Sequence, residues 1–382
     1  MNFETMLIHG GIEGDEHTGA VNVPIYQTST YKQTGIGENK GYDYSRAGNP
    51  TRGALEKLIA EMEGGAAGFA FASGMAAIST VLMLFRSGDK ILISDNIYGG
   101  TFRVLDKVFC NFDLKYEIVN TNDEKAILAK IDENVKAIYI ETPTNPTLGI
   151  TDIAKVTALA RSKGLLTIVD NTFMTPYLQK PIELGADIVV HSATKYLGGH
   201  SDMIAGLVVV NSRELSEKVY FLQKSVGGIL SPNDSFLMIR SIKTLSVRMD
   251  RHLENSTYIA EYLQKNEAVE KIYYPGLPEH EGYELQKKQA RGPGAVISFI
   301  LKPNYDINKF VKSLHIITLG ESLGGVESLL THPASMTHGA IPYDLRQEMG
   351  IVDELVRLSV GIENKQDLVD DLQNAINCAK VQ

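Results

Sequence analysis

The spacing of hydrophobic and polar residues divides the chain into three parts. Residues 1 to about 40 are rich in Gly, Thr and Pro and show little periodicity, which predicts an extended arm that reaches a neighbouring subunit. Helical spacing follows over residues 51–63, and then short apolar runs alternate with amphipathic segments such as 152–163. The apolar runs cover residues 90–94, 137–140, 165–169, 187–191 and 207–210. This alternation predicts an α/β core, a mostly parallel sheet with helices on both faces.

The pattern changes again towards the C-terminus. Residues 235–264 form a long amphipathic stretch without Pro or Gly, and the periodicity over 365–379 predicts a terminal helix. Two runs, 295–301 and 355–360, read as strands. We therefore predict an N-terminal arm over 1–48, a large domain over 49–240 and a smaller α+β domain over 241–382.

Composition and charge exclude several classes of protein. The 382 residues are 43% hydrophobic and 22% charged, as in ordinary globular proteins, and the net charge of −9 argues against a nucleic-acid surface. The two cysteines, Cys110 and Cys378, suggest neither a disulfide framework nor a cysteine-based zinc site, and we expect no metal. Residues 1–14 lack a signal-peptide pattern and no long apolar stretch occurs, so we expect a cytoplasmic protein that neither inserts into a membrane nor is secreted.

The most informative segment for chemistry is DIVVHSATKYLGGHS, residues 187–201, in which an apolar run leads directly to Lys195. Most lysines are solvated surface charges. Here the flanking residues are apolar, hydroxylic or Gly, so the amine is expected in a dry cleft where its pKa falls and it acts as nucleophile or base.

An alternative interpretation of this segment is the S-x-x-K motif of penicillin-recognising serine enzymes, formed here by Ser192 and Lys195. Those enzymes also require S-D-N and K-T-G. The chain offers Ser201-Asp-Met and Lys243-Thr-Leu, both different at the last position, and its serine lies at the end of a strand and not at the start of a helix. This alternative is disfavoured.

A second candidate site is Ser73-Gly74-Met75, where an apolar run turns into a helical segment. Free backbone N–H groups at a helix start bind anions, and Gly permits close approach, although an ordinary strand-to-helix turn explains the residues equally well. The glycines at 35, 37 and 41 have the wrong spacing for a dinucleotide fingerprint and follow no strand, so a Rossmann oxidoreductase is disfavoured.

Two further residues complete the set of candidates. Asp170 ends an apolar run, where a carboxylate can pair with a protonated ring nitrogen, but such residues are as often helix caps. Tyr98 offers a ring that can stack on a cofactor and a hydroxyl that can move protons, although a single Tyr usually serves in packing. Together with Lys195 and the anion site they match the needs of pyridoxal 5′-phosphate.

The chain resembles the Cys/Met-metabolism, or trans-sulfuration, family of fold-type I pyridoxal phosphate enzymes over essentially its whole length. The resemblance rests on many segments in order: Tyr44-Ser-Arg46-Ala-Gly-Asn-Pro-Thr-Arg, Ser73-Gly-Met, Tyr98-Gly-Gly, Glu141-Thr-Pro-Thr-Asn145-Pro, Val169-Asp170-Asn-Thr, Ser192-Ala-Thr-Lys195-Tyr-Leu-Gly-Gly-His, Glu321-Ser322-Leu-Gly-Gly and Arg357-Leu-Ser-Val-Gly-Ile-Glu.

The resemblance implies a role for each matching residue. Lys195 would carry the cofactor as a Schiff base and act as the base, Asp170 would pair with its ring nitrogen, and Tyr98 would stack on the ring and protonate the departing thiol. Further cofactor contacts are implied for Gly74, Met75, Ser192 and Thr194, and for Tyr44 and Arg46 lent by a neighbouring subunit. Substrate carboxylate binding is implied for Arg357 with Ser322 and Asn145. A homotetramer built as a dimer of dimers is expected.

Within the family, three residues favour substrates with two charged ends. Arg103 resembles an arginine that serves a distal carboxylate, Asp43 could meet a distal ammonium, and Glu321 resembles the acidic residue of cystathionine γ-lyases and γ-synthases. Methionine γ-lyases have a cysteine where this chain has Gly100, although residues 331–338 look much like theirs.

The likeness is greatest to bacterial cystathionine γ-lyases. It implies conversion of L-cystathionine to cysteine, 2-oxobutyrate and ammonia, with release of hydrogen sulfide from cysteine or homocysteine as a further expectation. The alternatives are a cystathionine γ-synthase, then a methionine γ-lyase and, from a different class, a non-catalytic relative that binds amino acids.

Overall fold

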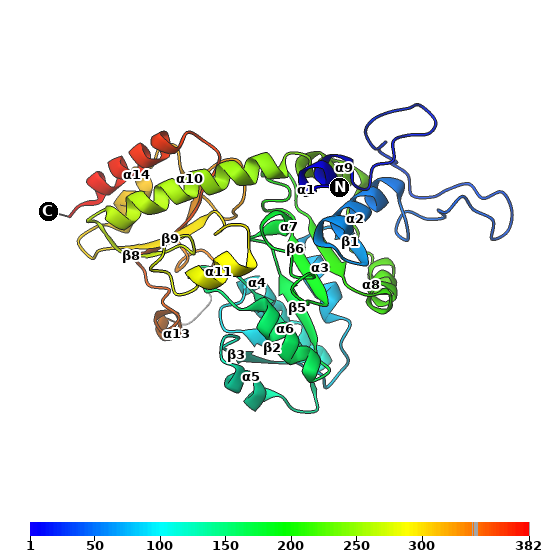
Figure 1. Cartoon of the computed structure of the whole chain (residues 1–382), viewed down its shortest axis with the longest axis horizontal. Coiled ribbons are helices and arrows are strands. Elements are labelled where there is room, and N and C mark those ends of the chain that lie inside the picture. The colour runs from blue at the N-terminus through cyan, green and yellow to red at the C-terminus, as the bar shows by residue number, and fades with distance from the viewer. Residues whose placement is uncertain (338, 340–342, 382) are drawn as a thin grey trace.

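The structure, a computed structural model, describes residues 1–337, 339 and 343–381. It contains two β-sheets, each with its own helices and hydrophobic core (Figure 1). The predicted domain boundaries, after residues 48 and 240, stay predictions.

The larger sheet has seven strands in the order β1-β7-β6-β5-β4-β2-β3. Neighbouring strands are parallel except that β7 runs antiparallel to both β1 and β6. The strands are β1 (Ala67–Phe71), β2 (Lys90–Ser94), β3 (Lys115–Val119), β4 (Val135–Glu141), β5 (Leu166–Asp170), β6 (Ile188–Ser192) and β7 (Gly206–Val210). Each predicted apolar run falls on one of these strands to within two residues at its start and one at its end.

Sequence analysis did not predict β3 as a strand. It forms an edge of the sheet, and Lys115 and Ile118 face solvent, so it lacks the continuous apolar run of the buried strands.

Helices cover both faces of the larger sheet, as predicted. One hydrophobic core includes residues of α2 and α6, and the other lies beneath α3, α4 and α8 on the opposite face. The helices of this part are α1 (Phe3–His9), α2 (Pro50–Glu63), α3 (Gly74–Leu82), α4 (Gly99–Lys107), the 3₁₀-helix η1 (Phe109–Phe112), α5 (Glu124–Lys130), α6 (Ile153–Ser162), α7 (Thr175–Leu178), α8 (Arg213–Val226) and α9 (Pro232–Ile242).

The smaller sheet has the strand order β10-β11-β12-β9-β8. Its strands are β8 (Val269–Tyr273), β9 (Val296–Leu301), β10 (Thr318–Leu319), β11 (Leu329–Thr331) and β12 (Leu355–Ser359), and the helices of this part are α10 (Leu245–Lys265), α11 (Tyr283–Gln289), α12 (Ile307–Lys312), α13 (Tyr343–Glu348) and α14 (Lys365–Ala379). The long amphipathic stretch of the sequence therefore forms two helices, because α9 ends at Ile242 and α10 starts at Leu245. In Figure 1, α10 runs from the larger sheet across to α14.

The N-terminal arm is only partly extended. Residues 3–9 form the helix α1, whose Leu7 is buried in the core beside Leu55 and Leu58 of α2, so the expectation of an arm without helix is wrong for this segment. From residue 11 to residue 48 no side chain is buried, and Figure 1 shows this segment as loops that leave the body of the molecule. Within the described residues, no helix has the length and apolarity that a membrane span requires.

Candidate active site

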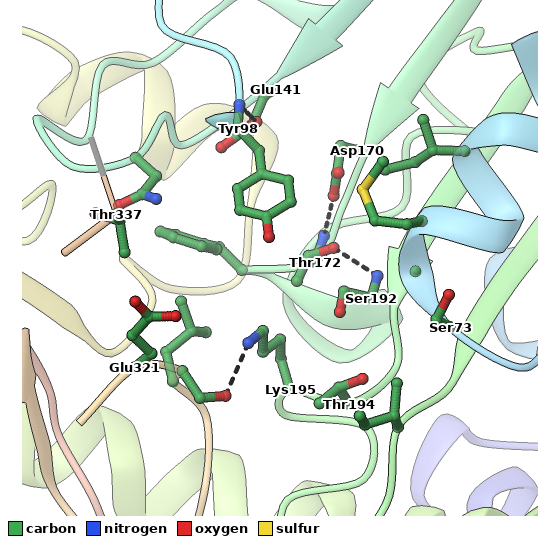
Figure 2. Close-up of a pocket in the computed structure, with 18 of the residues that line it drawn as sticks. Ser73, Tyr98, Glu141, Asp170, Thr172, Ser192, Thr194, Lys195, Glu321 and Thr337 are labelled. Carbon is green, nitrogen blue, oxygen red and sulfur yellow. Dashed lines mark hydrogen bonds between the residues drawn. The ribbon is translucent and has the colours of Figure 1, made fainter. Parts of the chain in front are cut away.

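The candidate site is a cavity of about 350 Å³ at the carboxyl ends of the parallel strands, shown in Figure 2. Ligands of open α/β sheets bind in this place because loops from several strands converge there. Its lining comprises Ser73, Gly74, Met75, Ile78, Tyr98, Glu141, Pro143, Asn145, Asp170, Thr172, Phe173, Ser192, Thr194, Lys195, Ile204, Glu321, Ser322, Leu323, Thr337 and Arg357. Eleven of the fifteen site residues predicted from the sequence belong to this lining.

Lys195 lies in the turn that follows β6, and its side chain enters the cavity. Its Nζ donates a hydrogen bond to Ser322 Oγ at 2.7 Å. Burial lowers the pKa of the amine to about 8, assisted by the positive charge of Arg357 and opposed by Glu321. A substantial part of these amines is therefore neutral near physiological pH, as a nucleophile or base requires.

The start of α3 forms an anion site with the turn after β6. Ser73 caps the helix by accepting a hydrogen bond from the Ala76 N–H at 3.0 Å. A Cβ on Gly74 would lie 2.9 Å from the Cβ of Ser192, so only Gly lets the helix start approach β6 this closely. The first amides of the helix, the hydroxyls of Ser192 and Thr194 and the positive end of the helix dipole thus face one part of the cavity.

Asp170 ends β5 and is buried in the cavity floor. Burial raises the pKa of its carboxyl, whereas hydrogen bonds from Thr172 and the charge of His191 lower it. The backbone N–H of Thr172 donates to Oδ1 at 3.0 Å, and the Tyr139 hydroxyl donates to Oδ2 at 3.4 Å. The carboxylate can accept a further hydrogen bond from a cationic ring nitrogen, which would relieve the cost of its burial.

Tyr98 immediately precedes α4, and its ring points into the cavity from the side opposite Lys195 (Figure 2). Its backbone N–H donates to Glu141 Oε2 at 2.6 Å. Burial raises the pKa of Glu141 well above its ordinary value, and the neighbouring charge of Asp170 raises it further. Glu141 therefore fixes the position of Tyr98 through its backbone.

Arg357, on β12 of the smaller sheet, reaches the cavity from the other side of the molecule. Its Nη1 donates to Asn145 Oδ1 at 2.9 Å, and its Nη2 donates to Ser322 O at 2.9 Å and Thr331 Oγ1 at 3.0 Å. Its Nε is buried without a hydrogen-bond partner in the described part of the chain. Because a buried unpaired donor is costly, this atom indicates the place of a ligand acceptor such as a carboxylate.

Four predicted site residues do not line the cavity of the single chain. Asp43, Tyr44 and Arg46 lie in the exposed part of the arm, where Arg46 packs over the Tyr44 ring and donates to Lys224 O. Arg103 is exposed on α4. Their assigned roles stay predictions, and those of Tyr44 and Arg46 were expected to operate in a neighbouring subunit.

Sequence reasoning missed several residues of the site. Glu141 and Thr172 occur in the family segments, yet no role was assigned to them, because a carboxylate that binds a backbone amide leaves no periodic pattern. Ile78, Phe173 and Thr337 also line the cavity without having been predicted.

The donor set fits pyridoxal phosphate on the evidence of the cavity itself. The anion site suits a phosphate, the buried Asp170 suits a pyridinium, and the Lys195 amine suits a carbonyl carbon. Two independent structural observations support this fit. They are the close approach of α3 to β6 at Gly74, beside the anion site, and the unpaired Nε of Arg357, which suits a substrate carboxylate.

Comparisons with known proteins agree with this fit. The sequence matches the family described as "Cys/Met metabolism PLP-dependent enzyme" over residues 4–377. It is 55% identical over 375 residues to a cystathionine beta-lyase of Lactococcus lactis subsp. cremoris (strain MG1363), covering 98% of this chain and 99% of the relative. A cystathionine gamma-lyase of Bacillus subtilis (strain 168) is 53% identical over 376 residues, with the same coverage.

Among solved structures, cystathionine gamma-lyase from Lactobacillus plantarum, complexed with L-serine, superposes with a TM-score of 0.97 at 54% sequence identity and covers 99% of both chains. This likeness confirms the predicted α/β fold of fold-type I, with its large sheet and smaller second sheet. The chain therefore belongs to the Cys/Met metabolism family of enzymes that depend on pyridoxal phosphate.

Proposed function

We propose that this carbon–sulfur lyase catalyses the γ-elimination of L-cystathionine, which with water yields L-cysteine, 2-oxobutyrate and ammonia. The observation that carries the proposal is the presence of Arg357, Lys195 and Glu321 in one cavity. Cystathionine has an amino-acid group at each end. Arg357 offers a buried fork for the α-carboxylate next to the reacting carbon, and the exposed Glu321 offers a carboxylate for the distal ammonium.

The residues of the chain supply the proton transfers. Bound pyridoxal phosphate acts as an electron sink conjugated with the substrate Cα. Lys195, whose amine has a pKa of about 8, removes the α-proton and then acts at Cβ, and Ser322 Oγ holds the amine in reach at 2.7 Å. The Tyr98 hydroxyl protonates the sulfur as the Cγ–S bond breaks, and Arg357 keeps the substrate oriented throughout.

The second candidate is β-elimination of cystathionine, which breaks the Cβ–S bond of the other half and yields homocysteine, pyruvate and ammonia. It is favoured by the relative from Lactococcus lactis, which is named a cystathionine beta-lyase and is 55% identical. This reaction needs proton removal at Cα only, so the same Lys195 and Arg357 would serve it.

The experiment that tests the proposal is product analysis with L-cystathionine as the only substrate. Mass spectrometry of derivatised products separates 2-oxobutyrate with cysteine from pyruvate with homocysteine. An excess of 2-oxobutyrate is expected, and an excess of pyruvate would replace the proposal by β-elimination. A second reaction with O-acetylhomoserine and cysteine tests the γ-synthase, which would be favoured if cystathionine formed faster there than 2-oxobutyrate forms in the first reaction.

The proposal extends to assembly and to side reactions. The exposed loops of residues 11–48 carry Tyr44 and Arg46, which suits a homotetramer made of dimers that share their sites. Cysteine and homocysteine are expected as poorer substrates that release hydrogen sulfide. Arg103→Ala tests the distal-carboxylate role: turnover of cystathionine should fall more than turnover of methionine, and equal losses would reject that role.

A further inference from the structure

A buried polar network lies below the cavity, at the ends of the strands that form its floor. Glu63, the last residue of α2, contacts His191 of β6, with Nε2 of the imidazole 2.7 Å from Oε1 of the carboxylate. The same oxygen accepts a hydrogen bond from Asn171 Nδ2 at 3.0 Å. Both side chains of the Glu63–His191 pair are fully buried. No role in the reaction described above has been assigned to these residues.

The network connects three neighbouring strands. Asn171 follows β5 and exchanges hydrogen bonds with Gln179, whose Nε2 also donates to Thr142 O beyond the end of β4 at 3.3 Å. At the end of each strand, one residue thus lines the cavity and an adjacent residue belongs to the network. Glu141, Asp170 and Ser192 line the cavity, whereas their sequence neighbours Thr142, Asn171 and His191 belong to the network.

The Glu63–His191 pair is costly to bury. A carboxylate at the C-terminal end of a helix meets the negative end of the helix dipole, and burial removes its hydration. Glu63 Oε2 and His191 Nδ1 have no hydrogen-bond partners within the described residues, so the remaining contacts compensate only in part. Replacing a buried ion pair by apolar residues is often neutral or stabilising, so stability alone is a weak explanation for this one.

The hydrogen bond with Glu63 of α2 holds His191 next to the end of β5, because Val190, the residue before His191, is the register partner of Asp170. We propose that Glu63 and His191 are positioning residues for the cofactor, because the pair fixes the strand ends and an imidazolium paired with the Glu63 carboxylate would place a positive charge behind Asp170. Asp170 then remains an anion and can pair with the cationic ring nitrogen of pyridoxal phosphate. Burial raises the pKa of Asp170, and the charge on His191 acts in the opposite direction, after the hydrogen bonds from Thr172.

This inference rests on the cofactor and not on the choice between γ- and β-elimination, so product analysis leaves it untouched. The decisive variant is Glu63→Gln, which keeps the shape and an acceptor for Asn171 but removes the carboxylate charge that faces the His191 imidazole. The dissociation constant for pyridoxal phosphate is measured from the visible absorbance that the protein retains at a series of free cofactor concentrations. Glu61→Gln, at the same end of α2, is the matched control.

We expect Glu63→Gln to weaken cofactor binding about tenfold, comparable to the loss of an outer partner of a metal-binding histidine. The readout that separates charge from structure is a double-mutant cycle with Asp170→Asn. In the Asp170→Asn background the carboxylate at residue 170 is absent. Glu63→Gln should therefore change the dissociation constant for pyridoxal phosphate less than about twofold there. Equal losses in both backgrounds, or no loss in either, would overturn the proposal.

A folding defect in Glu63→Gln does not prevent the test. His191→Gln removes the imidazole, the other member of the pair, and enters the same cycle, again with absorbance as the readout. It should reproduce the background-dependent loss, and a loss independent of residue 170 would again reject the electrostatic role.

Discussion

The floor of the cavity and the N-terminal arm both contain residues predicted to bind the cofactor, but those of the floor are buried in the cavity and those of the arm are exposed outside it. In the floor, Asp170 is buried, Lys195 is hydrogen-bonded to Ser322, and both are held at strand ends of one sheet. In the arm, Tyr44 and Arg46 are exposed and line no part of the cavity of their own chain. The floor residues thus meet within one chain, whereas the arm residues are proposed to reach the site of a second copy.

This difference separates two kinds of effect on the cofactor. A change in the floor alters charges in a dry environment, where electrostatic interactions are strong, and its effect is independent of protein concentration. If the arm serves a neighbouring subunit as proposed, a change in it acts only in the assembled protein, and its effect follows subunit association. The predictions below test whether the two regions behave in these ways.

The largest effect is expected for Lys195→Ala. The variant loses both the nucleophile and the base, so cystathionine turnover should fall by about 10³-fold or more, and the visible absorbance of the holoenzyme should disappear. Lys180→Ala, which removes a half-buried amine that pairs with Glu183 outside the cavity, is the control and should keep both properties. A visible band of native intensity in Lys195→Ala would contradict the assignment of Lys195.

The floor was also the region that the sequence predicted best. An apolar run that ends in Asp170 or leads into Lys195 predicts a strand buried on both faces. Because parallel strands have their carboxyl ends at one edge of the sheet, the sequence also predicts that these two residues lie close together. Residues that act through hydrogen bonds to backbone or to each other, such as Glu141 and the Glu63–His191 pair, leave no such pattern. Their partners lie 43 and 128 residues away in the chain.

The arm and the long C-terminal stretch show the limits of periodicity. The helix α1 is too short for its periodicity to stand out, and the packing of Leu7 against α2 and of Phe3 beside Tyr177 stabilises its seven residues. The break between α9 and α10 at Lys243 and Thr244 involves neither Pro nor Gly. There Arg248 of α10 folds back, and its Nη2 donates to Ser241 O at 3.0 Å, a tertiary contact that composition does not reveal.

An intermediate effect is expected for the arm. Arg46→Met should weaken cofactor binding about tenfold if this cation makes the proposed contact with the cofactor of a neighbouring subunit, while the unfolding of the isolated subunit stays unchanged. The complementation is run at a cofactor concentration that leaves Arg46→Met largely unloaded. When its subunits are mixed with Lys195→Ala subunits, a dimer with shared sites regains one native site in each mixed pair. About a quarter of native activity should return after subunit exchange.

The control for this experiment is Lys40→Met, which removes another exposed cation of the arm and should leave cofactor binding unchanged. If mixing restores no activity although mass spectrometry of intact assemblies shows exchanged subunits, the arm does not complete the site of a neighbour. Full activity of Arg46→Met alone would lead to the same conclusion.

The smallest effect concerns the stability of the cofactor-free protein and tests how dry the floor is. Burial lowers the pKa of Lys195 to about 8 from its ordinary value of 10.5, so between these values the unfolded chain binds more protons than the folded one. The unfolding free energy therefore carries a cost that is complete below pH 8 and disappears as the pH rises towards 10.5. Lys195→Met removes this cost, so the variant should exceed the native protein in stability by at most about 3 kcal/mol at pH 7 and by less at pH 9.5. Urea unfolding at the two pH values measures the difference, and a difference that is the same at both would show that the amine is solvated and not held in a dry floor.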